Sequence, residues 1–209
     1  MSALFRFDDV HVADGSHEIL RGVTLEIPEG GITVLTGPSG AGKSTLLRLC
    51  NRLEVISSGR LWFRGRPLME RDPIELRREV GMVFQRPTPF PGTVAENLRA
   101  AAALDDPQVD ALLARVGIAR DLAGRDALTL SGGEAQRVCM ARTLATGCSV
   151  LLADECTSSL DAAATEVVEA TARRLADDGD TVVWVTHDEQ QAARLGDHHI
   201  RIEEGRIVD

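Results

Sequence analysis

The sequence predicts an α/β fold with a mainly parallel central sheet. Nearly continuous apolar runs recur along the 209 residues, and such runs are typical of strands that are buried on both faces of a parallel sheet. Stretches with apolar residues at helical spacing lie between these runs. Because strands and helices alternate in this way, an α/β core is expected. The length suits a single domain, residues 1–209, that can bury a sizeable core.

The composition indicates a globular protein with an aliphatic core. Hydrophobic residues make up 44% of the chain and charged residues 26%, so a disordered protein is excluded. Aromatic residues are only 3%, which leaves Leu, Val, Ile and Ala to fill the interior. The net charge of −9 argues against a large nucleic-acid surface, because such surfaces need clustered Lys and Arg. We therefore expect no nucleic-acid partner.

Neither the cysteines nor any apolar run indicates a metal site or a membrane span. The chain has four cysteines: Cys50, Cys139, Cys148 and Cys156. They form no C-x-x-C pair and have no His at zinc spacing, so we expect reduced thiols in the core. His198 and His199 are predicted at a solvated strand edge. No run reaches the roughly 18 apolar residues of a membrane span, so work at a membrane would need another chain to supply the spans.

The first third of the chain is predicted to form an antiparallel β subdomain. Residues 4–12, 22–27 and 59–65 have alternating apolar and polar side chains and β-branched residues, and Gly, Asp and Ser turns separate them. Between the second and the third segment lies GITVLT at 31–36, a nearly continuous apolar run. This run is predicted to be a strand of the buried core sheet.

The rest of the chain supplies the other core strands and two clear helices. Strands are predicted at 80–84, 149–153, 181–186 and 198–202. A helix over 43–53 has an apolar stripe that ends at Leu53, and a helix over 161–178 has one apolar face. Residues 86–140 are rich in Ala and Leu and include a helical stretch at 106–118. We interpret 86–140 as a helical subdomain inserted into the α/β core.

The segment GPSGAGKST matches the pattern G-x-x-x-x-G-K-[ST] and lies between a predicted strand and a predicted helix. Its residues are Gly37, Pro38, Ser39, Gly40, Ala41, Gly42, Lys43, Ser44 and Thr45. The glycines let backbone N–H groups point at phosphate oxygens, and the helix N-terminus attracts the same charge. Lys43 is expected to reach the β- and γ-phosphates, and Ser44 to bind Mg²⁺. The loop alone indicates a P-loop core that binds some nucleoside triphosphate.

Two carboxylates follow the buried strand SVLLA. Asp154 is placed to assist Mg²⁺, and Glu155 is placed to act as a general base on an attacking water. The alternative is an acidic turn that caps the next helix, since residues 157–160 contain capping side chains. The phosphate loop upstream favours the catalytic interpretation.

Four more segments stand in a fixed order around these two. FQ lies at 84–85, LSGGE at 130–134, TSSLD at 157–161 and VTHD at 185–188. With the phosphate loop and the acidic strand end, the ordered set covers nearly the whole chain. On these segments the chain resembles the ATP-binding subunit of an ABC transporter. The resemblance implies an ATPase that uses ATP and Mg²⁺, has the P-loop NTPase fold, and powers transport through a separate membrane permease.

The resemblance also implies roles for residues outside the phosphate loop. Two subunits of this family pack head to tail as a homodimer and enclose two nucleotides. The signature residues Ser131, Gly132 and Gly133 would bind the γ-phosphate of ATP held by the partner. Gln85 would contact Mg²⁺ and the attacking water. His187 would hold the γ-phosphate and that water, and Asp161 would link the two sites across the dimer.

Three positions depart from the family's usual pattern. The family usually stacks adenine on an aromatic side chain, and that position falls near Asp14, where this chain has none. Adenine is therefore expected to be held weakly. Cys156 stands where the family usually has Pro, and Glu134 stands where it usually has Gln. None of these changes removes a catalytic group.

Residues 80–98 form the stretch expected to meet a membrane subunit. Three prolines stiffen it, and Phe90 is the expected anchor in that interface. This stretch resembles phosphate-importer ATPases, whereas VVWVTHD and ARTL resemble the small ATPases that pair with metal-exporting permeases. Either resemblance implies a cytoplasmic protein, peripheral on the inner face of the cell membrane.

Other functions stay open at this stage. A soluble ABC ATPase that acts on DNA or ribosomes is disfavoured. Relatives that act on DNA insert a long coiled coil, and the segment between Gln85 and Ser131 is too short for one. Relatives that act on ribosomes fuse two ATPase domains, and this chain has one. A small-molecule kinase would need an acceptor pocket and would have no use for LSGGE. A mechanotransmitting ATPase that moves no cargo would share every motif.

Overall fold

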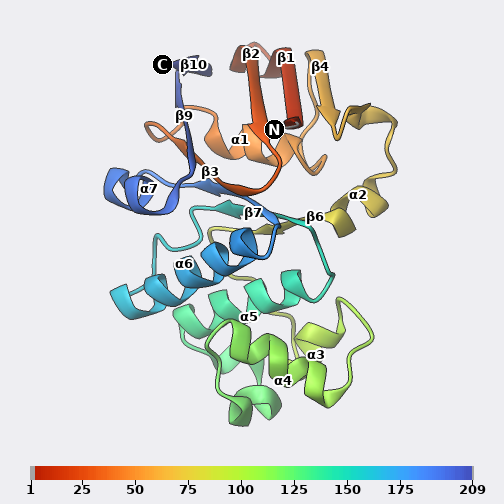
Figure 1. Cartoon of the computed structure of the whole chain (residues 1–209), viewed down its shortest axis with the longest axis vertical. Helices are drawn as coiled ribbons and strands as arrows, with labels where there is room; N and C mark the ends of the chain where they lie inside the picture. Colours follow the sequence, from red (N-terminus) through yellow and green to blue (C-terminus); the bar gives the residue numbers. More distant parts are fainter. Residues whose placement is uncertain (1–2, 209) are drawn as a thin grey trace.

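The computed structural model describes residues 3–208. It contains a six-stranded sheet with helices packed on it and, beside it, a four-stranded sheet (Figure 1). The smaller sheet is antiparallel, in the order β2-β1-β4-β5. Its strands are β1 (Ala3–Asp14), β2 (His17–Pro28), β4 (Ser58–Phe63) and β5 (Arg66–Pro67). The predicted antiparallel β subdomain is confirmed. β2 begins at His17, earlier than predicted, because its first residues pair with the end of β1.

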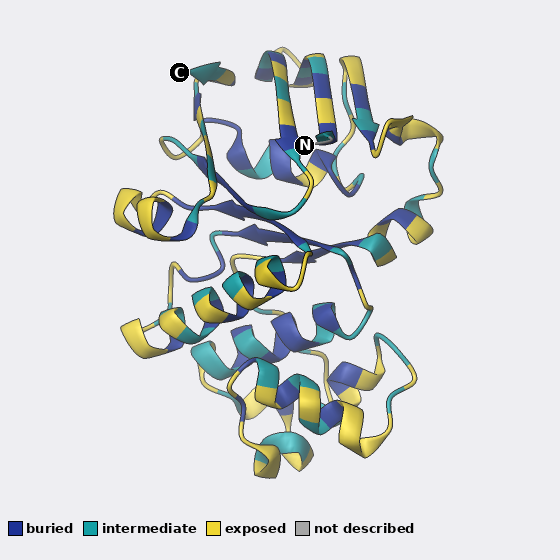
Figure 2. Ribbon diagram, viewed as in Figure 1, coloured by how far each residue is buried: buried dark blue, intermediate teal, exposed yellow. Residues whose placement is uncertain are grey.

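The larger sheet is parallel apart from one edge strand and has the order β10-β9-β3-β8-β7-β6. Its strands are β3 (Gly31–Thr36), β6 (Val80–Val83), β7 (Val150–Asp154), β8 (Thr181–Val185), β9 (His198–Glu203) and β10 (Arg206–Val208). All residues of β6, β7 and β8 are buried. The predicted mainly parallel sheet, with strands buried on both faces, is therefore confirmed (Figure 2).

Two apolar cores lie on opposite faces of the larger sheet. One contains α1 (Lys43–Leu49) and α2 (Pro73–Glu79) together with the inner face of the antiparallel sheet. The other contains residues of α6 (Ala162–Asp177), α7 (Glu189–Leu195) and the helices between β6 and β7. Alternate side chains of the central strands enter the two cores, which explains why those strands read as unbroken apolar runs.

The helix predicted over 43–53 was too long. α1 ends at Leu49, the backbone turns at Cys50, and the side chain of Leu53 is 43% exposed. Leu53 therefore does not belong to the buried stripe of α1. The helix predicted over 161–178 is confirmed as α6, which Asp161 caps by accepting a hydrogen bond from the backbone N–H of Ala164 at 2.7 Å.

The residues between β6 and β7 form helices, turns and one isolated bridge. The helices are α3 (Val94–Arg99), α4 (Asp106–Arg115) and α5 (Gly132–Leu144), with short 3₁₀ helices at Arg120–Gly124 and Ala127–Thr129. They lie together at the bottom of Figure 1. The division of the single domain into an α/β core and a helical subdomain at about 86–140 stays a prediction.

All four cysteines are free and buried, as expected for core residues. Burial raises the pKa of the Cys156 thiol to about 12, and it also raises the pKa of Cys50, Cys139 and Cys148. His198 and His199 lie on β9, and His199 is exposed. β9 is the second strand of the larger sheet, and β10 forms the edge beside it. Within residues 3–208, no helix has both the length and the apolar character needed to cross a membrane.

Candidate active site

The predicted catalytic segments meet at one edge of the larger sheet. The phosphate loop follows β3, Glu155 follows β7, and His187 follows β8 by two residues. Gln85 follows β6 by two residues. These four strands are parallel, so their carboxyl ends lie at the same edge. Ligands of open parallel sheets bind at this edge, which makes it the candidate site.

The phosphate loop has the backbone geometry that its glycines predict. Gly37 has φ 141, and a Cβ there would lie 2.0 Å from the carbonyl oxygen of Ile202. Gly42, with φ 100, caps the start of α1. A Cβ at Gly42 would lie 2.7 Å from Leu20 Cδ2, so both positions disfavour a side chain by contact and by backbone conformation. The loop can bend back on itself so that its N–H groups surround an anion.

Lys43 is the only lysine of the chain, and its side chain is 4% exposed inside the loop. Its Nζ donates to the carbonyl oxygens of Gly37 and Pro38, both at 2.9 Å. These two bonds hold the ammonium group at the centre of the loop. A positive charge fixed there is suited to bind phosphate oxygens.

Ser44 and Asp154 supply oxygens at one point beside the loop. The Ser44 hydroxyl donates to Asp154 Oδ1 at 2.6 Å, and Arg48 Nη2 donates to Asp154 Oδ2 at 3.3 Å. Asp154 is 3% exposed, so its charge is compensated rather than solvated. Hydroxyl and carboxylate oxygens are the donors that Mg²⁺ prefers, and the residues present fit this ion. Sequence reasoning did not find Arg48, because its helix and Asp154 are far apart along the chain.

Glu155 is the residue on which the other predicted catalytic groups converge. Lys43 Nζ lies 3.8 Å from Glu155 Oε1. Gln85 Nε2 donates to Glu155 Oε2 at 3.3 Å, and His187 Nδ1 lies 3.4 Å from the same oxygen. The Glu155 side chain remains 20% exposed and lines a cavity. The carboxylate can therefore reach a bound water while three neighbours fix its position.

The backbone of Glu155 adopts a left-handed conformation, with φ 44. For a residue other than Gly this conformation costs roughly 1–2 kcal/mol, and it persists only where the surrounding structure fixes it. Here the Glu155 N–H donates to the carbonyl of Val185 on neighbouring β8 at 3.1 Å. The strained turn and this bond set the direction in which the carboxylate leaves the end of β7.

A cavity of about 430 Å³ lies over the phosphate loop. Its lining includes Lys43, Ser44, Gln85 and Glu155, and also the β2 residues His17 and Ile19, which sequence reasoning had not singled out. A cavity of about 350 Å³ shares His17, Ile19 and Gly40 and continues towards Arg21 and Glu204. Asp14 lines neither cavity, although it pairs with His17 across the β1–β2 hairpin. An imidazole and an aliphatic side chain thus form the wall beside the loop.

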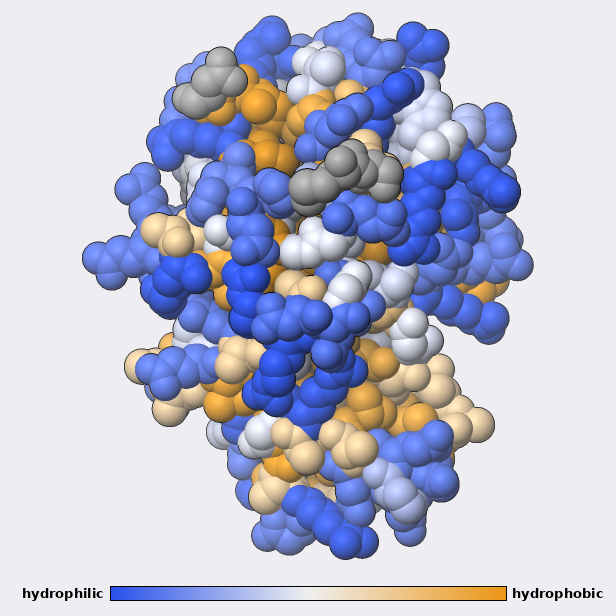
Figure 3. Space-filling view, viewed as in Figure 1, coloured by the Kyte–Doolittle hydropathy of each residue, from blue (hydrophilic) through white to orange (hydrophobic). Residues whose placement is uncertain are grey.

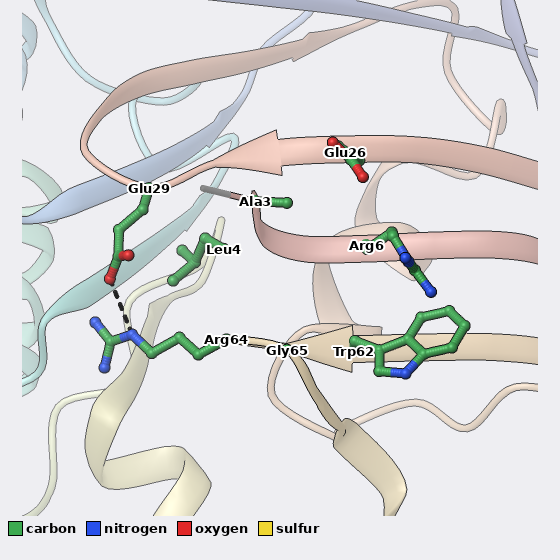
Figure 4. A pocket seen from close by; sticks show the side chains of 8 residues that line it. All are labelled: Ala3, Leu4, Arg6, Glu26, Glu29, Trp62, Arg64 and Gly65. Carbon is green, nitrogen blue, oxygen red and sulfur yellow. Dashed lines mark hydrogen bonds and ion pairs between the residues drawn. The ribbon is translucent and has the colours of Figure 1, made fainter. Parts of the chain in front are cut away.

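A larger cavity, about 540 Å³, lies on the antiparallel sheet (Figure 4). There the Arg6 guanidinium lies 4.0 Å from the centre of the Trp62 ring, and Arg64 pairs with Glu29 at 3.0 Å. It has no glycine-rich loop and no group of convergent catalytic side chains. We therefore assign the candidate site to the smaller cavity at the strand ends, because of the chemistry of its side chains and although its volume is lower.

The signature segment lies apart from this cavity. Ser131 caps α5 in a capping box: its Oγ accepts from the Glu134 N–H at 3.3 Å, and Glu134 Oε2 accepts from the Ser131 N–H at 2.9 Å. The Ser131 hydroxyl also donates to Glu134 Oε2 at 2.8 Å. That backbone hydrogen bond from Ser131 is the main cause of the lowered pKa of Glu134. None of Ser131, Gly132, Gly133 or Asp161 lines the cavity over the phosphate loop. Asp154 and His187 do not line it either, but they contact Ser44 and Glu155, whereas the signature residues and Asp161 have no such contact within residues 3–208.

Comparison with known proteins agrees with this geometry. The chain is 40% identical to the "Phosphate import ATP-binding protein PstB 2" of Ligilactobacillus salivarius, over 100% of this chain and 90% of that protein. It is 41% identical to "ABC transporter I family member 17" of Arabidopsis thaliana, over 97% and 79% of the two chains. Among solved structures, cbiO1 from Clostridium perfringens, described as part of the ABC transporter complex cbiONQ, superposes with a TM-score of 0.88 at 26% identity and covers 100% of this chain and 88% of its own.

Residues 20–158, which include the phosphate loop, the signature segment and Glu155, match the family described as "ABC transporter". The motif order, the strand-end site and the relatives thus agree. The chain belongs to the ABC transporter family, as one of its ATP-binding subunits.

Proposed function

We propose that this chain is the ATP-hydrolysing motor of a transporter whose membrane-spanning permease is a separate polypeptide. The observation that carries the proposal is the convergence of Lys43, Gln85 and His187 on Glu155, beside a phosphate loop. A structural acidic turn would need none of these three neighbours. Together they form a site for phosphoryl transfer to water.

The roles of the residues follow from their positions. Loop N–H groups and Lys43 bind the β- and γ-phosphates and stabilise the charge that spreads over the γ-phosphate oxygens. Glu155 accepts a proton from the attacking water. Gln85 and His187 both contact Oε2 of that carboxylate and orient the water. Ser44 and Asp154 would hold Mg²⁺, which when bound supplies further charge neutralisation at the phosphates.

Hydrolysis is proposed to require a homodimer. Ser131, Gly132 and Gly133 form a phosphate-friendly turn at the start of α5, a helix of 13 residues, yet they lie apart from the loop of their own chain. A head-to-tail partner would bring the same turn of a second copy to the γ-phosphate. The site of each chain would then be completed by residues of the other.

Ser131→Ala is expected to lower ATP hydrolysis about 10- to 100-fold, because a hydrogen bond to a charged group contributes about 1.5–3 kcal/mol. ATP binding to the single chain should be unchanged. Steady-state hydrolysis and equilibrium titration with ATP measure the two quantities.

Thr93→Ala is the matched control, because Thr93 forms the same capping box at the start of α3. Each variant should lose a helix cap worth about 0.5–2 kcal/mol and melt at a similarly lower temperature. Equal hydrolysis by both variants would show that Ser131 only caps its helix, and lost ATP binding by Ser131→Ala would place it in the site of its own chain.

The surface proposed to meet the permease lies around the loop after β6. Phe84 and Phe90 are 43% and 49% exposed, and Figure 3 shows apolar residues over the lower, helical part of that view. Arg142 of α5 fixes the loop: its guanidinium lies 3.9 Å from the centre of the Phe90 ring and donates to the Thr88 carbonyl at 3.1 Å. Gln136 of α5 also donates to the Phe84 carbonyl at 2.8 Å. Motion of α5 would therefore reach this surface directly.

Co-purification tests the proposed motor function. Tagged chain extracted in mild detergent with ATP is expected to carry with it a polytopic membrane protein. Bound to such a permease, the protein would lie peripherally on the cytoplasmic face of the membrane. The control is Phe90→Ala, which removes the expected anchor without touching the nucleotide site and should reduce the amount of membrane protein retained. Recovery of soluble partners alone, in several detergents, would instead indicate an ABC ATPase that does not drive transport.

A further inference from the structure

A buried polar cluster lies behind the catalytic residues, where α6, α7 and the segment after β7 meet. Its centre is Gln191 of α7, whose side chain is 3% exposed. Gln191 Nε2 donates to Thr157 Oγ1 at 3.0 Å and to Glu169 Oε1 at 2.7 Å. Gln191 Oε1 accepts from Trp184 Nε1 at 3.3 Å. The Gln191 amide thus connects α7 to β8, to α6 and to the segment after β7.

The charge in this cluster is compensated. Arg194, one turn further along α7, donates to both carboxylate oxygens of Glu169, at 3.0 and 2.7 Å. The guanidinium thus balances the charge of the carboxylate beside the buried amide. Both N–H groups of the Gln191 amide have an acceptor, so the side chain has one favoured position. A satisfied buried network of this kind is rigid, because moving any member leaves another without a partner.

The cluster ties together the two segments that carry catalytic groups. Thr157 follows Glu155 by two residues, and α7 begins two residues after His187. Asp188 caps α7 by accepting from the N–H groups of Gln190 and Gln191, so the start of the helix is fixed to the His187 segment. A bond between Gln191 and Thr157 therefore sets how far apart Glu155 and His187 can move.

We propose that Gln191 is a positioning residue for ATP hydrolysis, acting through Thr157 to hold the 3.4 Å approach of His187 Nδ1 to Glu155 Oε2. This inference rests on the proposed ATPase function of the site. Gln191 touches neither nucleotide nor water in the proposed mechanism. Its effect is geometric: a misplacement of about 1 Å at a reacting group can lower a rate about 10²-fold.

The test is Thr157→Val, which keeps the shape of the side chain and removes the oxygen that Gln191 binds. The bonds of Gln191 to Glu169 and Trp184 remain. We expect kcat for ATP hydrolysis by the full chain to fall about 10-fold, with KM for ATP changed less than about 2-fold, since the phosphate loop is untouched. Thr157→Ser retains the hydroxyl and should restore kcat. Thr157→Ala lacks the hydroxyl in a smaller side chain and should repeat the loss if the valine variant folds poorly.

Thr171→Val provides the control for stability alone. Thr171 is fully buried in α6, and its hydroxyl bonds to the carbonyls of Val167 and Arg115, away from the cluster. The Thr171→Val variant should melt at a lower temperature, as Thr157→Val should, but its kcat for ATP hydrolysis should be unchanged. If the two valine variants have the same kcat, the cluster only stabilises the fold and the proposal is wrong. A chain with no ATPase activity before any substitution would instead overturn the proposed function.

Discussion

Replacing Glu155 with Gln is expected to slow ATP hydrolysis by about 10²- to 10⁴-fold, which is the usual contribution of a general base. The amide has nearly the shape of the carboxylate and can still meet Lys43, Gln85 and His187, but it cannot accept a proton from water. ATP binding should persist, because the phosphate loop is unchanged. Single-turnover hydrolysis and titration with ATP separate the two effects.

The same variant should also report on dimerisation. If ATP closes two chains around two nucleotides, Glu155→Gln should elute as a dimer with ATP and as a monomer without it. Glu26→Gln is the matched control, since it removes an exposed carboxylate from the antiparallel sheet, far from the strand-end site. It should hydrolyse ATP normally. Full activity of Glu155→Gln, together with a monomer in ATP, would refute both the catalytic role and the proposed dimer.

Lys43→Ala should weaken ATP binding about 10- to 100-fold, because an ammonium–phosphate hydrogen bond contributes about 1.5–3 kcal/mol. Turnover should suffer more, about 10²- to 10³-fold, since charge on the γ-phosphate grows towards the transition state. Isothermal titration with ATP and a phosphate-release assay measure the two losses.

Arg48→Ala serves as the comparison for Lys43→Ala. Arg48 is also a cation near the site, but it contacts Asp154 and does not line the cavity over the phosphate loop. Arg48→Ala should keep its affinity for ATP, which Lys43→Ala weakens. Normal binding and turnover by Lys43→Ala would mean that the glycine-rich loop is not the phosphate site of this chain.

Much of the fold could be predicted because its signals are local. β3, β7 and β8 are short apolar runs, and each is followed by a motif: the phosphate loop after β3, Glu155 after β7 and His187 after β8. The helices α2 and α7 were missed because each has only seven residues, largely polar, and each depends on an aspartate cap. Leu53 was wrongly assigned to α1 because the apolar spacing continues past the point where the backbone turns.

The parts of the site that sequence could not show are contacts between distant segments. Arg48 lies against Asp154, and His17 lies at the cavity wall, only because two sheets pack around α1. Gln191 reads as one polar residue of a polar helix, and its buried position appears only when α6 and α7 are packed together. By contrast, the convergence on Glu155 was predictable, because parallel strands bring their carboxyl ends together.

The single lysine of the chain has a practical consequence. Reagents that acylate amines will find one side-chain amine here, and it lies in the phosphate loop with 4% of its surface exposed. A bound nucleotide would cover it further. The mass added to Lys43 by a limited acylation reaction, measured with increasing ATP, would therefore read out the occupancy of the loop directly, without a fluorophore, an isotope or any engineered residue.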